Sequence, residues 1–279
     1  MPPQRPLFPT AWPHLQIMLT DDGSRTLLDT QLGETYHSGC GALAECLVVY
    51  LRNSGVETKL QQGCSKQADS SMLALRLLEL GFGTGMAFLL TAAAAQAYDC
   101  PLEYTSIENR LLPAEILGEL KIGQAIQAAI QRGLLPAGFA VAERIESEWL
   151  QFRARLPLAP SDQEITWMAS EHIRLRLILS DAQHYLNNPA PAQAMTDSRT
   201  NTALFDAIYY DAFSPGSNPI LWSDTMLQAT LSRLQPQGNL VSYCVSGPVR
   251  RSLQQAGFTV TRLPGPPGGK REVLLATKP

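Results

Sequence analysis

Three glycines in five positions are the first residues of this sequence that point to chemistry. The run Glu79-Leu-Gly-Phe-Gly-Thr-Gly85 follows an apolar segment and precedes an alanine-rich one. In a doubly wound α/β sheet, ligands bind where a strand turns into a helix beyond the strand's carboxyl end. Glycines at such a turn permit positive φ and let a ligand approach the backbone closely. The sequence therefore predicts a ligand-binding turn at Gly81, Gly83 and Gly85.

Three classes of ligand compete for this turn. A phosphate-binding P-loop requires Gly-Lys-Ser/Thr, and Met86 follows Gly85, which excludes that class. A dinucleotide fingerprint requires glycine or alanine where Met86 stands, and methionine is bulky there. The run fits instead an S-adenosylmethionine turn, in which glycines pack against the amino-acid part of the cofactor. We therefore expect S-adenosylmethionine here, with Glu79 reaching its ammonium and with Phe82 and Thr84 as further contacts.

Acidic residues close three further apolar segments that we expect to be strands. Glu108 ends the next segment, where a carboxylate can accept hydrogen bonds from both ribose hydroxyls. Asp181, with Ala182 beside it, follows the third segment, where an acid can accept from the adenine amino group. Asp211 ends the fourth, next to where the methyl group would be presented. These residues are predicted to bind the cofactor, and Asp211 is also predicted to be catalytic.

The segment after Asp211 predicts a rigid substrate loop. Phe213, Ser214 and Pro215 begin a turn that contains two prolines, which fix φ and remove donors. Its logic is similar to that of the Asp/Asn-Pro-Pro-Tyr loops of amino-group methyltransferases. An alkylamine is mostly protonated at neutral pH, and only the neutral amine attacks a methyl group. Asp211 is expected to accept the amine hydrogen, while most of the acceleration comes from in-line positioning.

The elements around these residues alternate between strands and helices. Apolar segments typical of strands are 74–80, 102–108, 173–181, 205–213, 238–244, 258–265 and 271–278. This pattern predicts an α/β fold of the class I S-adenosylmethionine-dependent methyltransferase type: Rossmann-like, with a mostly parallel seven-stranded sheet and an antiparallel edge hairpin. Residues 1–60 are expected to form a small β-rich N-terminal module that packs on a catalytic domain of residues 61–279. Residues 133–172 carry no motif that we can place.

Composition favours a cytoplasmic globular protein. The chain has 279 residues, is 45% hydrophobic and carries a net charge of −3. No apolar run approaches the roughly 20 residues that a membrane span needs, and the proline-rich start does not read as a secretory signal. Five cysteines without CxxC spacing are expected to be reduced thiols, with no metal site.

Several long motifs resemble, in order, the methyltransferase domain of the MnmC-type tRNA-modification enzymes. They are "ELGFGTG", "YYDAFSPGSNPILW", "GPVRRSLQQAGFTV" and "GGKREVLLATK", preceded by "DDGSRTLLDTQLGETYHSGCGALAECLVVYL". The resemblance runs from about Leu15 to Lys278. It implies methyl transfer to the 5-aminomethyl group of a wobble 2-thiouridine, giving 5-methylaminomethyl-2-thiouridine, with the tRNA anticodon loop as partner. It also implies a stand-alone form without the flavin oxidase domain, and therefore no FAD.

The resemblance carries further residues into the expected site. Tyr36, His37 and Glu45 match the family's opening module, whose counterparts help to close the cofactor or substrate pocket. Basic residues match motifs near the active-site rim, where they could grip anticodon phosphates beside an unstacked base. These basic residues are Arg250, Arg251, Lys270 and Arg271.

Three alternatives stay open on the sequence alone. The same fold could methylate another amine, on a small molecule or a protein. An aminopropyltransferase shares the acids at the strand ends, although its polyamine pocket would need more carboxylates near Asp211. A non-catalytic binding module is the third, and the presence of Glu108, Asp181 and Asp211 argues against it.

Overall fold

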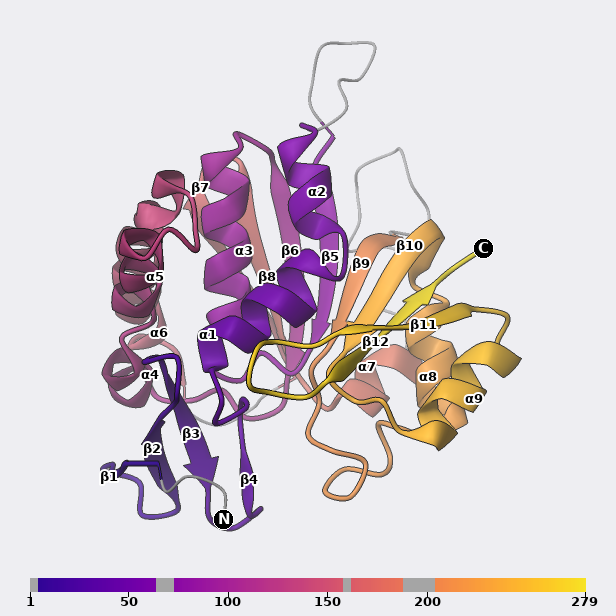
Figure 1. Ribbon diagram of the computed structural model, residues 1–279, viewed down its shortest axis with the longest axis horizontal. Coiled ribbons are helices and arrows are strands. Elements are labelled where there is room, and N and C mark those ends of the chain that lie inside the picture. The colour runs from indigo at the N-terminus through magenta and orange to yellow at the C-terminus, as the bar shows by residue number, and fades with distance from the viewer. Residues whose placement is uncertain (1–4, 64–72, 158–161, 188–203) are drawn as a thin grey trace.

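The computed structural model describes residues 5–63, 73–157, 162–187 and 204–279 (Figure 1). Its strands form two separate sheets. The smaller sheet has four antiparallel strands in the order β1-β2-β3-β4. Its strands are β1 Leu7–Pro9, β2 Leu15–Leu19, β3 Arg25–Asp29 and β4 Glu34–Thr35. β2 and β3 form an antiparallel hairpin.

The larger sheet has eight strands in the order β11-β12-β10-β9-β5-β6-β8-β7. These strands are β5 Leu75–Leu80, β6 Leu102–Glu108, β7 Gln163–Ser170, β8 Ile173–Leu179, β9 Phe205–Tyr210, β10 Leu234–Ser242, β11 Thr259–Pro264 and β12 Glu272–Thr277. Neighbours from β10 to β8 are parallel, while β7 and β12 run antiparallel to their neighbours. The predicted α/β class, parallel centre and antiparallel edge hairpin are confirmed.

The sheet has one strand more than the seven predicted. The additional strand, β7, lies at the edge beside β8 and falls in the segment 133–172 that carried no recognisable motif. Most of its side chains are exposed or half-buried. The alternation of buried and polar positions that announces a strand is therefore weak there.

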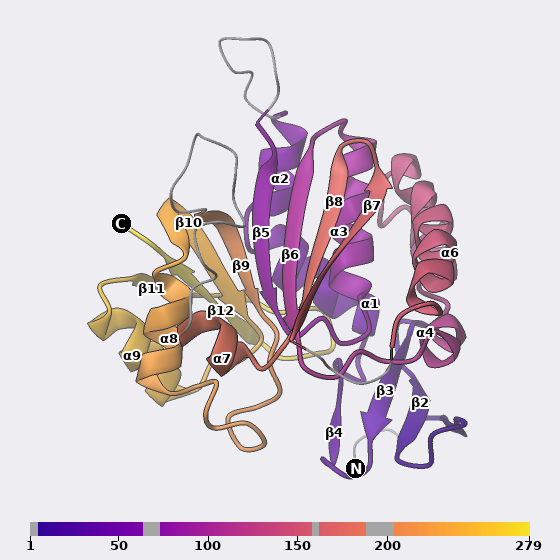
Figure 2. The same ribbon diagram turned by 180° about the vertical axis from the view of Figure 1, so that it is seen from behind.

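Helices cover both faces of the large sheet (Figures 1 and 2). One face carries α1 Ala42–Glu45, the π-helix η1 Cys46–Arg52, α2 Val56–Gln61, α3 Met86–Ala97, α4 Ala114–Leu120, α5 Ile122–Gln131, the 3-10 helix η2 Ala137–Val141 and α6 Ala142–Arg153. The other face carries α7 Ala182–Asn187, α8 Asp224–Leu231 and α9 Gly247–Gln255. Lys121 adopts φ +52° at the junction of α4 and α5 and so separates the two helices.

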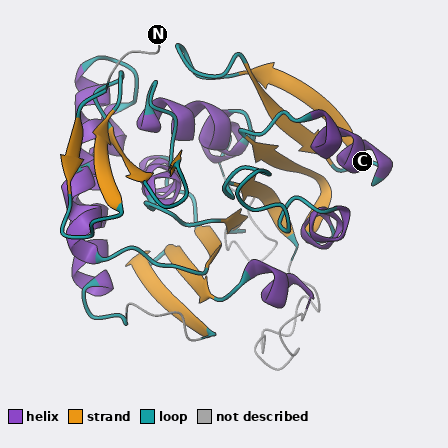
Figure 3. Ribbon diagram, turned by 90° about the horizontal axis from the view of Figure 1, so that it is seen from below, coloured by secondary structure: helices purple, strands orange, loops and turns teal. Residues whose placement is uncertain are grey.

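The small sheet lies near the carboxyl ends of the parallel strands, where the loops of the large sheet also gather (Figures 1 and 2). Figure 3 looks at the molecule from this end. The strands account for only the first part of the expected module 1–60, since residues 42–61 form helices, of which η1 and α2 contact α3. This arrangement places the opening segment beside the ends of the strands that carry the predicted site.

One cysteine does not have the reduced thiol that the sequence predicted. Cys40, Cys46 and Cys244 are free thiols, whereas Cys100 is disulfide-bonded, so the prediction of reduced thiols throughout is wrong for Cys100. Cys64 lies outside the described residues. Among the residues that the structure describes, no helix is long and apolar enough to cross a membrane, and no group of three or more His, Cys, Asp or Glu side chains could hold a metal ion.

Candidate active site

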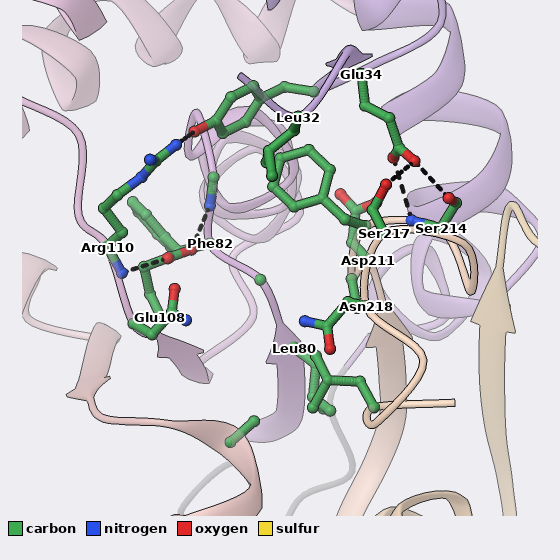
Figure 4. A pocket seen from close by; sticks show the side chains of 18 of the residues that line it. Leu32, Glu34, Leu80, Phe82, Glu108, Arg110, Asp211, Ser214, Ser217 and Asn218 are labelled. Atoms are coloured by element: carbon green, nitrogen blue, oxygen red, sulfur yellow. Dashed lines mark hydrogen bonds between the residues drawn. The ribbon is translucent and has the colours of Figure 1, made fainter. Parts of the chain in front are cut away.

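A cavity of about 890 Å³ opens at the carboxyl ends of β5, β6, β8 and β9 (Figure 4). The glycine turn after β5 forms part of its wall, and residues from β4 and from the loop after β9 form another part. A doubly wound sheet is expected to bind its ligand in this crevice. Most of the predicted residues therefore meet in one place, although the chain supplies them from distant segments.

The glycine turn has the backbone that the sequence predicted. Gly81, Gly83 and Gly85 have φ values of +92°, +52° and +75°. A Cβ at Gly81 would lie 2.6 Å from the backbone oxygen of Asp211, and a Cβ at Gly83 would lie 3.3 Å from the Tyr36 ring. These two glycines thus keep the turn close to its neighbours and line the cavity. Gly85 does not line it and instead begins α3 as a left-handed N-cap.

Glu108 joins the end of β6 to the glycine turn. Its carboxylate accepts from the backbone N–H of Gly83 at 3.0 Å and from that of Arg110 at 2.7 Å (Figure 4). Burial raises the pKa of Glu108, and these hydrogen bonds oppose the rise. Arg110 also pairs at 2.6 Å with Asp29, whose side chain is fully buried, and donates to the Tyr36 hydroxyl at 3.3 Å. The small sheet is therefore bound to the side of the cavity that carries Glu108.

Asp211 faces the cavity from the end of β9, and the hydroxyl of Tyr50 donates to its Oδ1. Tyr50 is fully buried in the π-helix η1, a type of turn that often marks functional sites. Burial, together with the nearby Glu45 carboxylate, raises the pKa of Asp211 well above its usual range, while the Tyr50 hydrogen bond lowers it. Burial also raises the pKa of Glu45, to about 7. Both carboxyl groups are thus held toward their neutral forms, and a cationic ligand bound beside them would favour ionisation.

Glu79 and Asp181, two of the acids predicted to bind the cofactor, differ in whether they line the cavity. Glu79 is 1% exposed and does not line the cavity; its carboxylate accepts from Ser106 at 2.7 Å. Asp181 does line the cavity with Ala182, and its Oδ1 accepts from the backbone N–H of Gln183 at 2.7 Å. Asp181 thus begins α7 as well as facing the cavity.

The predicted substrate residues fall into two groups. Five line the cavity, namely Tyr36, Glu45, Phe213, Ser214 and Lys270, as does His37. Four do not, namely Pro215, Arg250, Arg251 and Arg271. Arg250 and Arg251 lie in α9, which packs on α8 and β11. Any contact of these arginines with a ligand must therefore lie outside the cavity.

Sequence reasoning missed three residues that shape the cavity. Tyr50 bonds Asp211, Glu34 bonds the loop after β9, and the ring of Tyr243 lies 4.3 Å from Nζ of Lys270. Tyr50 stands five residues after Glu45 in the opening segment, but only the three-dimensional path of η1 shows that it meets β9. Glu34 precedes Tyr36 by two residues in the run that matched the opening module, and this was the available signal.

The buried Glu79 predicts a pH dependence of stability. Burial raises its pKa from 4.5 to about 8, so the folded state holds a proton that the unfolded state releases. This contribution is fully present below pH 4.5 and is lost as the pH rises through about 8. Each pH unit in that window corresponds to about 1.4 kcal/mol for one group. In thermal melts followed by circular dichroism, Glu79→Gln should therefore lose less Tm than the wild type between pH 5 and pH 8.

The exposed Glu119 supplies the control for this measurement, because its carboxylate lies at the surface on α4. Glu119→Gln should keep the wild-type dependence of Tm on pH. Equal slopes for the wild type and Glu79→Gln would show that Glu79 does not titrate in this way.

Comparison with known proteins agrees with this geometry. Residues 143–279 match the family described as S-adenosyl-L-methionine-dependent methyltransferase. The MnmC protein of Burkholderia multivorans, named as a tRNA 5-methylaminomethyl-2-thiouridine biosynthesis bifunctional protein, is 28% identical over 260 residues, which is 91% of this chain and 33% of that protein. The protein of the same name from Paracidovorax citrulli is 30% identical over 262 residues, or 90% of this chain and 34% of that protein.

The chain thus spans about a third of the length of these curated relatives. Among solved structures, MNMC2 from Aquifex aeolicus superposes with a TM-score of 0.67 at 25% identity, covering 100% of this chain and 73% of that one. Residues 143–279 are thus similar to S-adenosyl-L-methionine-dependent methyltransferases, within a chain that is similar along about nine tenths of its length to the MnmC proteins.

Proposed function

We propose that this protein methylates the amino group of 5-aminomethyl-2-thiouridine at the wobble position of tRNA, giving 5-methylaminomethyl-2-thiouridine. The observation that carries the proposal is the position of Asp211, which lines the cavity beside the glycine turn while Tyr50 bonds one of its carboxylate oxygens. The names of the relatives, which are those of tRNA 5-methylaminomethyl-2-thiouridine biosynthesis proteins, support the choice of substrate.

The cavity has features that fit S-adenosylmethionine, which supplies a methyl group activated by its sulfonium. A Cβ at Gly81 or Gly83 would meet Asp211 or Tyr36, so glycine lets the turn lie close to both residues while its backbone lines the cavity. Glu108 keeps acceptor capacity after its two backbone hydrogen bonds, because each carboxylate oxygen has two lone pairs. We assign the ribose to Glu108 and the adenine end to the wall formed by Asp181 and Ala182.

Glu79 was expected to reach the ammonium of the cofactor, but it does not line the cavity. It lies behind the cavity wall, bonded to Ser106, so we assign it an indirect effect on the amino-acid end of the cofactor through the residues that it supports. Phe82 and Thr84 line the cavity within the turn itself. We keep both as contacts of the amino-acid part.

Asp211 acts on the acceptor amine. An alkylammonium entering the cavity meets the carboxyl groups of Asp211 and Glu45, and its charge favours their ionised forms. Once ionised, Asp211 takes a proton from the ammonium, and the nitrogen lone pair set free attacks the methyl group as the bond from methyl carbon to sulfur breaks. Tyr50 holds Asp211 in one orientation during this step. The chemistry requires neither a metal nor a flavin.

The rim of the cavity suits an unstacked base. Leu32 and Ile220 line the cavity and are 43% and 55% exposed, and Phe213 also lines it. RNA loops are recognised through splayed bases that contact such apolar and aromatic side chains. We assign anticodon phosphates to Lys270 at the rim, and to Arg250, Arg251 and Arg271 beyond it. Residues 1–60 would serve as the N-terminal module of a cytoplasmic enzyme with a catalytic domain of residues 61–279.

Competition between acceptors tests this proposal. The protein is incubated with methyl-labelled S-adenosylmethionine and tRNA from cells that lack this methylation, with and without a large excess of free alkylamines. We expect label in the RNA that the amines do not reduce. Cofactor binding without label in RNA would leave the methyltransferase assignment and move the acceptor to another amine.

A further inference from the structure

The loop that follows Asp211 is fastened to the small N-terminal sheet by one carboxylate. Glu34, in β4, accepts from the backbone N–H of Ser214 at 3.2 Å and from the hydroxyls of Ser214 and Ser217 (Figure 4). Hydrogen bonds to an ionised carboxylate are stronger than those between neutral groups. Glu34 therefore gathers three donors of one loop onto a single side chain from a distant part of the chain.

The loop closes on the same residue from its other side. The backbone N–H groups of Ser217 and Asn218 both donate to the carbonyl of Ser214, at 3.0 and 2.9 Å. Ser214 is thus held at its N–H and hydroxyl by Glu34 and at its carbonyl by the turn. Ser214, Ser217 and Asn218 all line the cavity. The conformation of this part of the cavity wall depends on Glu34.

The same segment of the small sheet also reaches the opposite wall. Tyr36 packs edge-on against Phe213 with ring centroids 5.2 Å apart, and its hydroxyl accepts from Arg110. Its ring lies 3.3 Å from where a Cβ of Gly83 would stand. Tyr36 thus contacts both the loop after Asp211 and the glycine turn. By contrast, all the side-chain hydrogen bonds that Glu34 makes among the described residues go to the loop after Asp211.

The lowered pKa of Glu34 agrees with a carboxylate that is ionised while it holds the loop. Burial alone would raise its pKa, but the hydrogen bonds from Ser214 and Ser217, together with the charge of Lys270, lower it below the ordinary value. Glu45 and Asp211, in the same cavity, have raised pKa values. Glu34 is the acid of this group that the fold stabilises in its charged form, as a fixed acceptor for hydroxyl donors requires.

We propose that Glu34 is a positioning residue for the acceptor, which holds the loop Phe213–Asn218 in the shape that presents the target base to Asp211. The role is specific to the acceptor side, because Glu34 makes no hydrogen bond to the glycine turn or to Glu108 among the described residues. This inference rests on the proposed methyl transfer, and it assigns to the small sheet a part in substrate selection.

Steady-state kinetics and cofactor binding test the role together. Glu34→Ala should raise KM for tRNA about tenfold and lower kcat, because the loop loses hydrogen bonds to a charged acceptor. Its affinity for S-adenosylhomocysteine should stay within about threefold of wild type. Glu34→Gln keeps one acceptor oxygen and should recover part of the loss. An equal loss of cofactor affinity and acceptor KM would overturn the proposal, as would wild-type kinetics in Glu34→Ala.

A double-mutant cycle separates positioning from general destabilisation. Ser217→Ala removes one donor to Glu34, so adding it to Glu34→Ala should change KM little beyond the single variant. Independent, additive effects of the two substitutions would contradict a shared contact. Glu119→Ala, which removes an exposed carboxylate of α4, serves as the control and should leave the kinetics unchanged. Its Tm gives the change in stability caused by removing a carboxylate far from the loop.

Hydrogen exchange distinguishes failure of this inference from failure of the proposed function. In Glu34→Ala, the amides of Ser214, Ser217 and Asn218 should exchange at least about tenfold faster than in the wild type, whatever the acceptor is. Faster exchange in a protein whose wild type never methylates tRNA would refute the proposed function but support the role of Glu34 in holding the loop. Unchanged exchange would refute that role of Glu34, even if tRNA is methylated normally.

Discussion

Replacing Asp211 with asparagine should lower the rate of methyl transfer by about 10²–10⁴-fold, the usual contribution of a positioned acid or base. Asparagine has the same shape and can still accept from Tyr50 through its carbonyl oxygen. Its other group is then an amide NH₂, which donates toward the cavity where the amine also needs an acceptor. The affinity for S-adenosylmethionine should stay within about threefold, because the bare glycine turn and Glu108 are untouched. Single-turnover transfer and calorimetric cofactor binding measure the two quantities separately.

Tyr50→Phe provides a graded comparison on the same carboxyl group. It removes one hydrogen bond to Asp211 without changing the residues that line the cavity. Loss of such a bond to a charged group corresponds to a rate decrease of about tenfold, which is smaller than that of Asp211→Asn. Transfer by Asp211→Asn at the wild-type rate would remove this residue from the mechanism.

Gly81→Ala should lower transfer by at least about 100-fold and weaken cofactor binding by a similar factor. Gly81 has φ +92°, and the added Cβ would stand 2.6 Å from the backbone oxygen of Asp211. Backbone atoms cannot rotate away, so the turn or the end of β9 must shift. A displacement of about 1 Å in a reacting geometry is enough for a loss of this size. Turnover with labelled cofactor and a binding isotherm report the two effects.

The matched control for this variant is Gly257→Ala. Gly257 has a similar φ of +88°, but no heavy atom lies within 4 Å of its added Cβ. It should therefore show only the backbone strain of about 1–2 kcal/mol in the free energy of unfolding, with normal transfer. If both variants lose the same activity, the effect comes from stability and the close approach at Gly81 has no special role.

The centre of the fold was predictable because its residues carry strong local signals. Parallel strands buried on both faces read as continuous apolar runs, and β6 matches its predicted bounds of 102–108. The same runs end in Glu108 and Asp211, so their meeting at one edge of the sheet followed from topology. The bare glycine turn could likewise be inferred, because only glycine adopts positive φ freely.

The remaining features depend on contacts between distant segments, which leave no periodic pattern. Glu34 and Ser214 are far apart in the sequence, and their hydrogen bond follows from how the small sheet docks at the cavity. Tyr50 looks like an ordinary apolar position of a helix until its hydroxyl is placed beside Asp211. The exposed edge strand β7 escaped prediction because packing on one neighbour suffices to form it.

Nucleoside analysis of the methylated tRNA tests the central claim most directly. Unmethylated tRNA is incubated with the protein and S-adenosylmethionine, digested, and its nucleosides are separated and identified by mass spectrometry. The account predicts that 5-methylaminomethyl-2-thiouridine appears while 5-aminomethyl-2-thiouridine disappears in equal amount, and that Asp211→Asn produces neither change. Methylation of any other nucleoside, or an unchanged wobble base with cofactor bound, would contradict it.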